Sequence, residues 1–375
     1  MTRIFLFFLC FLFLQNSFSQ QFYIRGRVID NETKLPLKGA SVYINNTTLG
    51  TITDSDGNFE LGTFQPGIYQ VVASYVGYKP LLYSAEVNTS GFLIRFKLDK
   101  KETIIREVLV LNSETRKRYI EIFKKFVLGI SNAAEHCSVK NIEEVQFASG
   151  DTKDEIRAYT EKELVIENPE LGYTLYFELV DFNYSKVDSR AFFLGYTRYV
   201  DWGKDEETKK KWLRKRREAY EGSTVHFFRS LIKKELAGEG FTVYQLGRLQ
   251  RSENDTISAD ASVQKTTTGI QMESKTIEDN MIRIYPDSVY RIYELLIAEG
   301  WRINYAKNTS LKTEVMKKTF LVQPRKGTLV GLRLRTAPVL INEKGIMLTP
   351  IGAYYEGVWA YERLANMLPE DYEVK

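Results

Sequence analysis

Hydrophobic and polar residues alternate along short stretches in the N-terminal quarter of the chain. Between Phe22 and Val28 every second residue is apolar or glycine, and the same period of two returns at 40–44, 69–75 and 92–98. A period of two places successive side chains on opposite faces of a β-strand. Glycine and proline residues punctuate the stretches between these segments. Closely spaced strands between turn signals predict an antiparallel β-sandwich.

The pattern changes to a helical period after residue 112. Apolar residues recur at i, i+3, i+4, i+7 and i+8 from Tyr119, which is the spacing of one face of an α-helix. Asn112 or Ser113 is the predicted N-cap, and Gly129 is the predicted end. A helix with one apolar face must pack against a partner, so it belongs to a second folded domain.

Strand and helix patterns mix in the rest of the chain. Helices are predicted at 206–220 and 223–236, and a short one at 357–372 that Pro369 stops. Strands are predicted at 162–185 (two strands around a turn at 168–172), 190–200, 240–247, 281–286, 288–297, 301–306, 318–324 and 338–348. The predicted fold class is therefore mainly β with an α+β C-terminal part. Residues 20–111 would form the sandwich, and 112–375 a larger antiparallel-sheet domain with several helices.

The first residues indicate export. Arg3 precedes an unbroken apolar run from Ile4 to Leu14, and polar and small residues follow up to Ser19. This order is typical of a secretory signal peptide, and the run is too short to cross a ~30 Å hydrocarbon core as a helix. We expect residues 1–19 to be removed; a short buried helix is the alternative. Only Cys137 would then remain, so no internal disulfide is expected.

A dense set of spaced motifs covers the sandwich region. They are Gly26-x-Val28-x-Asp30, Thr33-x-x-Pro36-Leu37-x-Gly39-Ala40-x-Val42, Gly50-Thr51-x-Thr53-Asp54-x-x-Gly57-x-Phe59-x-Leu61, Gly67-x-Tyr69, Tyr75-x-Gly77-Tyr78 and the segment REVLV at 106–110. This set resembles the carboxypeptidase regulatory-like domain. The resemblance implies a seven-stranded, prealbumin-like β-sandwich without catalytic residues. In exported proteins of Gram-negative bacteria such modules precede enzymes, TonB-dependent receptors or uncharacterised domains.

The second part of the chain resembles the companion region of the same sandwich in exported proteins without an assigned activity. The matching segments are 126–131 with Cys137, 166–182, 216–231 with 240–244, and 357–372. The resemblance implies an architecture and no mechanism.

Asp54, Asp56 and Asn58 surround Gly57 and raise the question of a metal site. A calcium loop spreads its ligands over about twelve residues and ends in a bidentate acid, whereas strand alternation resumes here at once with Phe59. Asp-Gly is also a strong hairpin signal. We predict the turn of a β-hairpin and keep a bound ion at these residues as the weaker alternative. No cofactor is expected.

Motifs for the common hydrolytic chemistries are missing from the sequence. Neither of the two histidines, His136 and His226, is followed three residues later by the glutamate that a zinc carboxypeptidase needs. There is no Gly-x-Ser-x-Gly elbow and no glycine-rich phosphate loop. The adjacency of His136 and Cys137 does not aim a base at a thiol. We predict a protein that is not an enzyme; a hydrolase with an Asp/Glu pair in 112–375 is the alternative.

Basic residues cluster between Lys209 and Arg217, on one of the predicted helices. The formal net charge of +4 implies no polyanionic partner, so no nucleic acid is expected. Acidic residues at 205–207 precede lysines by four positions, the favourable order for helical ion pairs, and we predict a solvated helix face. In the alternative, anionic lipid or lipopolysaccharide phosphate contacts four of these side chains: Lys211, Arg214, Lys215 and Arg217.

His226 and Arg229 lie one helical turn apart. Together they could form an anion site, although a buried polar network that fastens the helix to a sheet is the favoured interpretation. The tryptophans are predicted to be core residues and not sugar platforms. The sequence thus predicts a binding or assembly component of the periplasm or outer membrane. Its expected partner is another envelope protein or a glycan, with peripheral membrane association as a further option; a glycan-binding module is an alternative.

Overall fold

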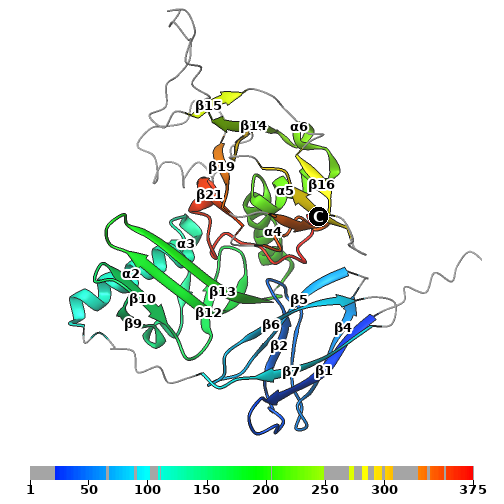
Figure 1. The fold of residues 1–375 in the computed structure, drawn as a ribbon, viewed down its shortest axis with the longest axis vertical. Helices are drawn as coiled ribbons and strands as arrows, with labels where there is room; N and C mark the ends of the chain where they lie inside the picture. The colour runs from blue at the N-terminus through cyan, green and yellow to red at the C-terminus, as the bar shows by residue number, and fades with distance from the viewer. Residues whose placement is uncertain are drawn as a thin grey trace, which may run out of the picture. The chain divides into compact units, whose positions relative to one another are not determined.

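The computed structural model describes residues 22–64, 67–87, 91–101, 109, 111–203, 205–248, 270–273, 281–285, 291–297, 300–306, 328–335, 338–349 and 352–374 (Figure 1). The chain divides into two compact units: Met1–Ile44 with Gly50–Lys101, and Asn45–Leu49 with Glu102–Lys375. The predicted signal peptide at 1–19, the predicted strand at 318–324 and all of 106–110 except Leu109 lie outside the described residues. The domain boundary at residue 111 stays a prediction.

Seven strands form two sheets in the first unit, which confirms the predicted sandwich. One sheet has the order β4-β1-β7 and the other β3-β2-β5-β6. The strands are β1 (Phe22–Asp30), β2 (Ser41–Ile44), β3 (Gly50–Ile52), β4 (Asn58–Phe64), β5 (Gly67–Ser74), β6 (Leu81–Val87) and β7 (Phe92–Leu98). Alternate residues such as Ile24, Val42 and Phe96 are buried between the sheets, as the two-residue period predicts.

One pair of strands in this unit is parallel. β1 and β7 run in the same direction from Ile24 opposite Phe92 to Asp30 opposite Leu98, whereas the other pairs are antiparallel. The two strands approach closely at Gly26, where an added Cβ would lie 1.9 Å from the carbonyl oxygen of Ile94. Glycine at this position therefore permits the parallel pairing.

The second unit contains three sheets and several helices. A six-stranded sheet has the order β8-β11-β12-β10-β9 with β13 paired to β12, a five-stranded sheet has the order β15-β14-β18-β19-β21, and a three-stranded sheet has the order β16-β17-β20. The helices are α2 (Ser113–Leu128), α3 (Asn132–His136), α4 (Glu206–Tyr220), α5 (Thr224–Lys233) and α6 (Leu236–Glu239), with 3-10 turns at Ile142–Glu144 and Val358–Ala360. The strands are β8 (Ser138–Val139), β9 (Gln146–Ser149), β10 (Glu155–Tyr159), β11 (Leu164–Asn168), β12 (Tyr173–Ser185), β13 (Arg190–Asp201), β14 (Phe241–Arg248), β15 (Ile270–Glu273), β16 (Ile282–Ile284), β17 (Ile292–Leu295), β18 (Gly300–Tyr305), β19 (Thr328–Leu334), β20 (Leu340–Asn342) and β21 (Ala353–Gly357).

Helix α2 begins and ends where the sequence predicts. The side chain of Asn112 accepts a hydrogen bond from the Thr115 amide at 2.8 Å, and Gly129 closes the helix at φ 101°. Its apolar face packs on the six-stranded sheet, where the rings of Phe123 and Phe182 lie 5.1 Å apart. The predicted second domain thus has one hydrophobic core between α2 and the six-stranded sheet.

The helices at α4 and α5 are confirmed, and the second ends earlier than predicted. Ser223 caps α5, and Lys234 adopts a left-handed conformation (φ 60°) that stops it before the short α6. A second core joins α5 to the five-stranded and three-stranded sheets, with Phe227, Trp301 and Trp359 fully buried.

The predicted tail helix at 357–372 is wrong. Strand β21 runs to Gly357, and only the 3-10 turn Val358–Ala360 follows it. The amides of Leu364 and Ala365 donate to the carbonyls of Val127 and Leu128 at 3.1 and 3.2 Å. These carbonyls belong to the last turn of α2 and have no partner within that helix. The tail folds along α2 because its backbone pairs there and not with itself.

Candidate functional site

A cavity of about 270 Å³ lies in the second unit. Its wall combines the end of α4, the start of α5, Phe193 of β13, the turn at 345–347 and the tail from Glu362 to Tyr372. Aromatic and apolar side chains make up much of this wall: Tyr220, Val225, Phe228, Met347, Tyr355 and Trp359. Three of the four charged side chains in the wall (Glu362, Arg363 and Glu370) come from the tail, which is the segment whose structure the sequence did not predict.

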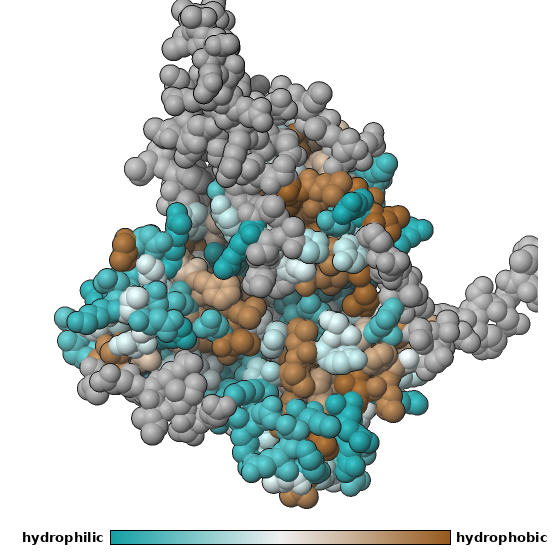
Figure 2. All heavy atoms as spheres, in the orientation of Figure 1, coloured by the Kyte–Doolittle hydropathy of each residue, from teal (hydrophilic) through white to brown (hydrophobic). Residues whose placement is uncertain are grey.

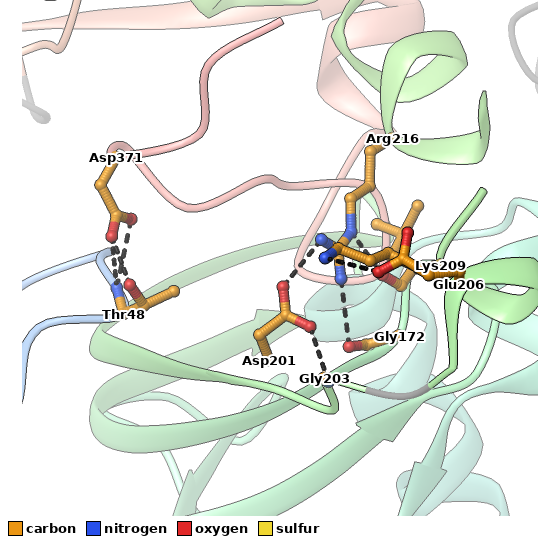
Figure 3. A network of polar contacts seen from close by, with 9 residues as sticks. Thr48, Gly172, Asp201, Gly203, Glu206, Lys209, Arg216 and Asp371 are labelled. Carbon is orange, nitrogen blue, oxygen red and sulfur yellow. Dashed lines mark hydrogen bonds and ion pairs between the residues drawn. The ribbon is translucent and has the colours of Figure 1, made fainter. Parts of the chain in front are cut away.

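Arg229 fixes the tail at one side of the cavity. Its guanidinium group donates to the carbonyls of Lys344 (2.9 Å), Tyr372 (3.2 Å) and Glu370 (3.2 Å). Residues 45–49 hold the tail from another direction, because the Glu370 amide donates to the Asn46 carbonyl at 2.7 Å and the Thr48 amide donates to the Asp371 carboxylate at 3.2 Å (Figure 3). Arg229 therefore has a structural role at the rim.

His226 is buried on α5, one helical turn before Arg229. Its Nδ1 accepts a hydrogen bond from the Gly222 amide at 2.9 Å, and its Nε2 lies 3.1 Å from the Glu239 carboxylate. The rings of Phe241 and Tyr305 pack around it at 4.9 and 5.8 Å. The hydrogen bonds of His226 and Arg229 thus go to different parts of the chain, although both side chains contact the ring of Tyr220, at 4.8 and 5.7 Å. This supports a polar network that fastens the helix more than a shared anion site.

Glu370 carries an unusual carboxyl group in the cavity wall. Burial raises the pKa of this group to about 8, although a hydrogen bond from the Asn46 side chain at 3.3 Å and the positive charges of Lys344 and Arg229 oppose the shift. Asp371 adds to the rise. A carboxyl with this pKa is mostly protonated at neutral pH, so it can donate a hydrogen bond.

Two donors in the tail lack an acceptor within the described part of the chain. Asn366 is 6% exposed; its Oδ1 accepts from the Ser131 hydroxyl at 2.6 Å, and its Nδ2 has no partner. The guanidinium of Arg363 lies 5.5 Å from the ring centre of Phe193 and makes no hydrogen bond or ion pair with any residue that the structure describes. Burial lowers the pKa of Arg363. The Asn366 amide donates to the Arg363 carbonyl at 2.8 Å, so both side chains leave the same turn.

Sequence reasoning missed Arg363 and Asn366. Their segment was predicted to be a helix, and its resemblance to the companion region of the sandwich implies no role for either residue. The local signal is an arginine three residues before an asparagine in a mostly apolar stretch that also holds Glu362, which is too common to identify a site.

The basic cluster on α4 divides into one buried and several exposed residues. Arg216 is 5% exposed and donates to the carbonyls of Leu171 (2.7 Å) and Gly172 (3.2 Å) and to the Asp201 carboxylate (2.8 Å) (Figure 3). It also stacks 3.8 Å from the ring centre of Tyr173. Burial is the largest single influence and raises the Asp201 pKa, but the hydrogen bonds from Arg216 and the Gly203 amide and the charges of Arg216 and Lys209 together lower it.

The other basic side chains of α4 lie on its outer faces. Lys211, Arg214 and Arg217 are exposed, and Lys215 pairs with Glu218 at 3.4 Å and Glu170 at 3.9 Å. Glu206 forms an ion pair with Lys209 at 3.5 Å. The two residues are three positions apart in the sequence, whereas the predicted spacing was four. Contact of this face with an anionic surface stays a prediction.

Asp54 forms a turn with its own backbone. Its carboxylate accepts from the amides of Asp56 (2.9 Å) and Asn58 (2.8 Å), and the Asn58 bond is the largest cause of a lowered Asp54 pKa. Gly57 adopts φ 76°, and a Cβ there would lie 2.5 Å from the Val28 carbonyl oxygen. Across the described residues, no group of three or more His, Cys, Asp or Glu side chains could hold a metal ion.

The predicted hairpin at this turn is wrong, because β3 and β4 belong to different sheets. The turn connects the two layers of the sandwich. Asp-Gly signals a tight turn, but the choice between a hairpin and a crossover depends on which strands bury the neighbouring apolar residues.

His136 and Cys137 point to different partners. His136 Nδ1 lies 3.5 Å from Glu170, while Cys137 is buried and free, and burial raises the pKa of its thiol to about 12. A thiol with this pKa is a poor nucleophile.

The tryptophans do not form a surface platform. Trp212, Trp301 and Trp359 are buried, and the ring of Trp202 lies 5.7 Å from that of Trp212. The described helices include none that is long and apolar enough to cross a membrane. Figure 2 shows apolar residues (brown) among polar ones (teal) on the described surface; in the first unit, Ile52 and Leu93 are 69% and 81% exposed.

Comparison with known proteins identifies the first unit. Residues 24–110 match the model of the CarboxypepD_reg-like domain family. This segment is a carboxypeptidase regulatory-like domain. A segment of 91 residues is 38% identical to the TonB-dependent receptor SusC of Bacteroides thetaiotaomicron, and the match covers 24% of this chain and 9% of the receptor.

Solved structures add little to this identification. A cohesin–X-dockerin complex from Acetivibrio cellulolyticus is 18% identical with a TM-score of 0.20 and covers 29% of this chain and 76% of that chain. A candidate carbohydrate-binding protein from Bacteroides uniformis is 10% identical with a TM-score of 0.19 and covers 86% of this chain and 100% of that chain. Neither likeness carries an argument, because both TM-scores are below 0.5.

Proposed function

We propose that this chain is a non-catalytic binding component of a bacterial envelope, with a small-ligand site in its second unit. The observation that carries the proposal is the cavity of about 270 Å³ with its apolar wall and two donors, Arg363 and Asn366, that have no acceptor among the described residues. Concave, mostly apolar sites with a few convergent polar groups are the usual binding sites of small molecules. The carboxypeptidase regulatory-like domain serves as a structural module of the chain.

The envelope location rests on two supports. Residues 1–19 have the pattern of a secretory signal peptide, and the matched segment is similar to part of a TonB-dependent receptor. The proposed location is the periplasm or the outer membrane, and the proposed partner is another envelope protein or a glycan.

Hydrolysis is the second candidate function, and Glu370 is the observation that favours it. A general acid must hold its proton near neutral pH, and burial gives Glu370 a pKa of about 8. Glu362 lies in the same wall and would be the second carboxylate. Turnover of a glycan or peptide library by the purified chain, lost in Glu370→Gln, would establish this function and refute the first.

A fragment screen on the purified full chain tests the binding site. Val225 lines the cavity, so Val225→Trp fills it and Val225→Ala is the matched control. We expect thermal-shift hits with the wild type and Val225→Ala that disappear with Val225→Trp. Hits that survive in Val225→Trp, or no hits at all, would contradict a ligand site in this cavity.

N-terminal sequencing of the chain recovered from the envelope tests export. The proposal predicts a mature chain that begins at Gln20. Recovery of the uncleaved chain from the cytosol would contradict it.

A further inference from the structure

We infer that the cavity of the second unit binds a small organic monocarboxylate, with its carboxylate at Arg363 and Asn366 and its apolar body against Trp359 and Met347. This inference deepens the proposed binding function and rests on it. It specifies the charge, the size and the orientation of the ligand.

The guanidinium of Arg363 supplies the first argument. It lines the cavity, stacks on Phe193 and has no acidic partner among the described residues. Charges removed from water are normally paired. A guanidinium offers a planar fork of donors that matches a carboxylate at two points. A ligand carboxylate would therefore supply the missing counter-ion.

The amide of Asn366 supplies the second. The distance of 2.6 Å between the Ser131 hydroxyl and the Asn366 side chain is typical of an O–H···O bond, which assigns the oxygen to this contact. The Ser131 oxygen also accepts from the Ala134 amide at 3.2 Å, so its proton is available for Asn366. The NH₂ group is then left as a buried donor without a partner. Buried donors in native proteins are normally satisfied, and a second carboxylate oxygen would satisfy this one.

The remaining charges of the wall favour one negative charge on the ligand. Arg229 and Arg363 are cationic, and Glu362 and Glu370 are the acids in the wall. Burial keeps Glu370 mostly protonated at neutral pH, and in that form its O–H is a further donor. One excess positive charge remains, which fits a monoanion better than a phosphate monoester.

Size and apolarity define the rest of the ligand. An apolar protein cavity of ~150 Å³ binds benzene, so about 270 Å³ has room for one ring or a short alkyl chain together with a carboxylate. Trp359, Tyr355, Met347 and Phe228 would contact that apolar body. A bare inorganic anion would leave this wall uncovered.

Calorimetric titration of the full chain with matched acids and amides tests the inference. The probes are benzoate, phenylacetate and hexanoate, each compared with its neutral amide. We expect at least one acid to bind about 10-fold or more tightly than its amide, because hydrogen bonds to charged groups are stronger than neutral ones. Arg363→Met should abolish this preference, and Arg363→Lys should retain part of it. Arg214→Met, at an exposed arginine of α4, is the matched control and should retain all of it.

The outcomes separate this inference from the proposed function. Equal binding of acids and amides, abolished by Val225→Trp, would leave the ligand site in place and overturn the carboxylate assignment. A preference for acids that survives in Arg363→Met would also overturn it, provided that a thermal melt shows that the variant is folded. No binding of any probe, together with no hit in the fragment screen, would overturn both.

Discussion

Two arginines of the second unit have opposite relations to their surroundings. Arg216 is buried under α4, where two backbone carbonyls, the Asp201 carboxylate and the face of Tyr173 use its guanidinium. Arg363 lies in the cavity wall with one aromatic ring beside it and no acceptor in the described part of the chain. The protein itself supplies the hydrogen-bond partners of Arg216. In our proposal, a ligand supplies those of Arg363.

This difference separates structural polar residues from candidate binding residues. Asp54 is a structural polar residue like Arg216, because its carboxylate accepts hydrogen bonds from backbone amides of its own turn. Asn366 is a candidate binding residue like Arg363, because its side-chain NH₂ group has no partner among the described residues. A fully satisfied polar group should contribute to stability, and an unsatisfied one should be neutral or costly. The predictions below test this division, from the largest expected effect to the smallest.

Arg216→Met should have the largest effect. It removes three hydrogen bonds and leaves buried carbonyls and Asp201 without their partner, so we expect a loss of about 3 kcal/mol in the free energy of unfolding. Urea denaturation measures it. Arg214→Met, on the exposed side of the same helix, should change it by less than about 0.5 kcal/mol. A loss below about 1 kcal/mol in Arg216→Met would contradict the claim that the hydrogen bonds of Arg216 stabilise the fold.

Glu370→Gln should change the pH dependence of stability. The folded chain holds a proton on Glu370 up to about pH 8, whereas the ordinary value is 4.5. The stabilisation is complete below pH 4.5 and is lost as the pH rises to about 8, because the unfolded chain ionises and the folded one does not. The full shift corresponds to about 5 kcal/mol, and solvent screening at this half-buried side chain reduces it. The neutral variant should therefore match the wild type at pH 4.5 and exceed it by about 2 kcal/mol at pH 9. Equal stability of the two at both pH values would show that Glu370 is not buried in its acid form.

Asp54→Ala should lower the melting temperature slightly, since two backbone donors lose their acceptor. Asp56→Ala is the control, because Asp56 contributes backbone atoms to the turn: its amide donates to Asp54 at 2.9 Å, and its carbonyl accepts from Arg27 at 2.6 Å. The melting temperature of the wild type should not change with calcium chloride. A calcium-dependent increase that Asp54→Ala removes would restore the metal site.

Arg363→Met should have the smallest effect on folding. Removing a partly buried charge without a counter-ion should change the stability by less than about 0.5 kcal/mol, or raise it slightly. A loss as large as that of Arg216→Met would show that Arg363 has a structural partner and would remove the basis for the ligand site.

The sequence predicts the elements that local pattern determines. The sandwich, α2 with its cap at Asn112, and α4 all follow from periodicity and capping residues. The parallel pairing of β1 with β7 and the crossover after Asp54 depend on contacts between distant segments, so local pattern does not reveal them. The helix prediction for the tail failed for the same reason, because the amides of the tail pair with carbonyls of α2 more than two hundred positions earlier in the sequence.

The candidate site was even less predictable than the fold. Arg216 and Arg214 belong to one basic run, and only burial distinguishes them. Arg363 and Asn366 acquire their meaning from Phe193 and Ser131, which lie far away in the sequence. The resemblance to the carboxypeptidase regulatory-like domain was confirmed for 24–110, and it says nothing about the cavity in the second unit.

The most direct test of the central claim is a nitrogen-15 NMR spectrum of the full chain with and without the tightest-binding acid. The side-chain resonances of Arg363 and Asn366, assigned with Arg363→Lys and Asn366→Gln, report whether these donors gain an acceptor. We predict that the acid shifts the Nε–H of Arg363 and the NH₂ of Asn366 and leaves the Nε–H of Arg216 in place. Unchanged Arg363 and Asn366 resonances at saturating acid would contradict the account.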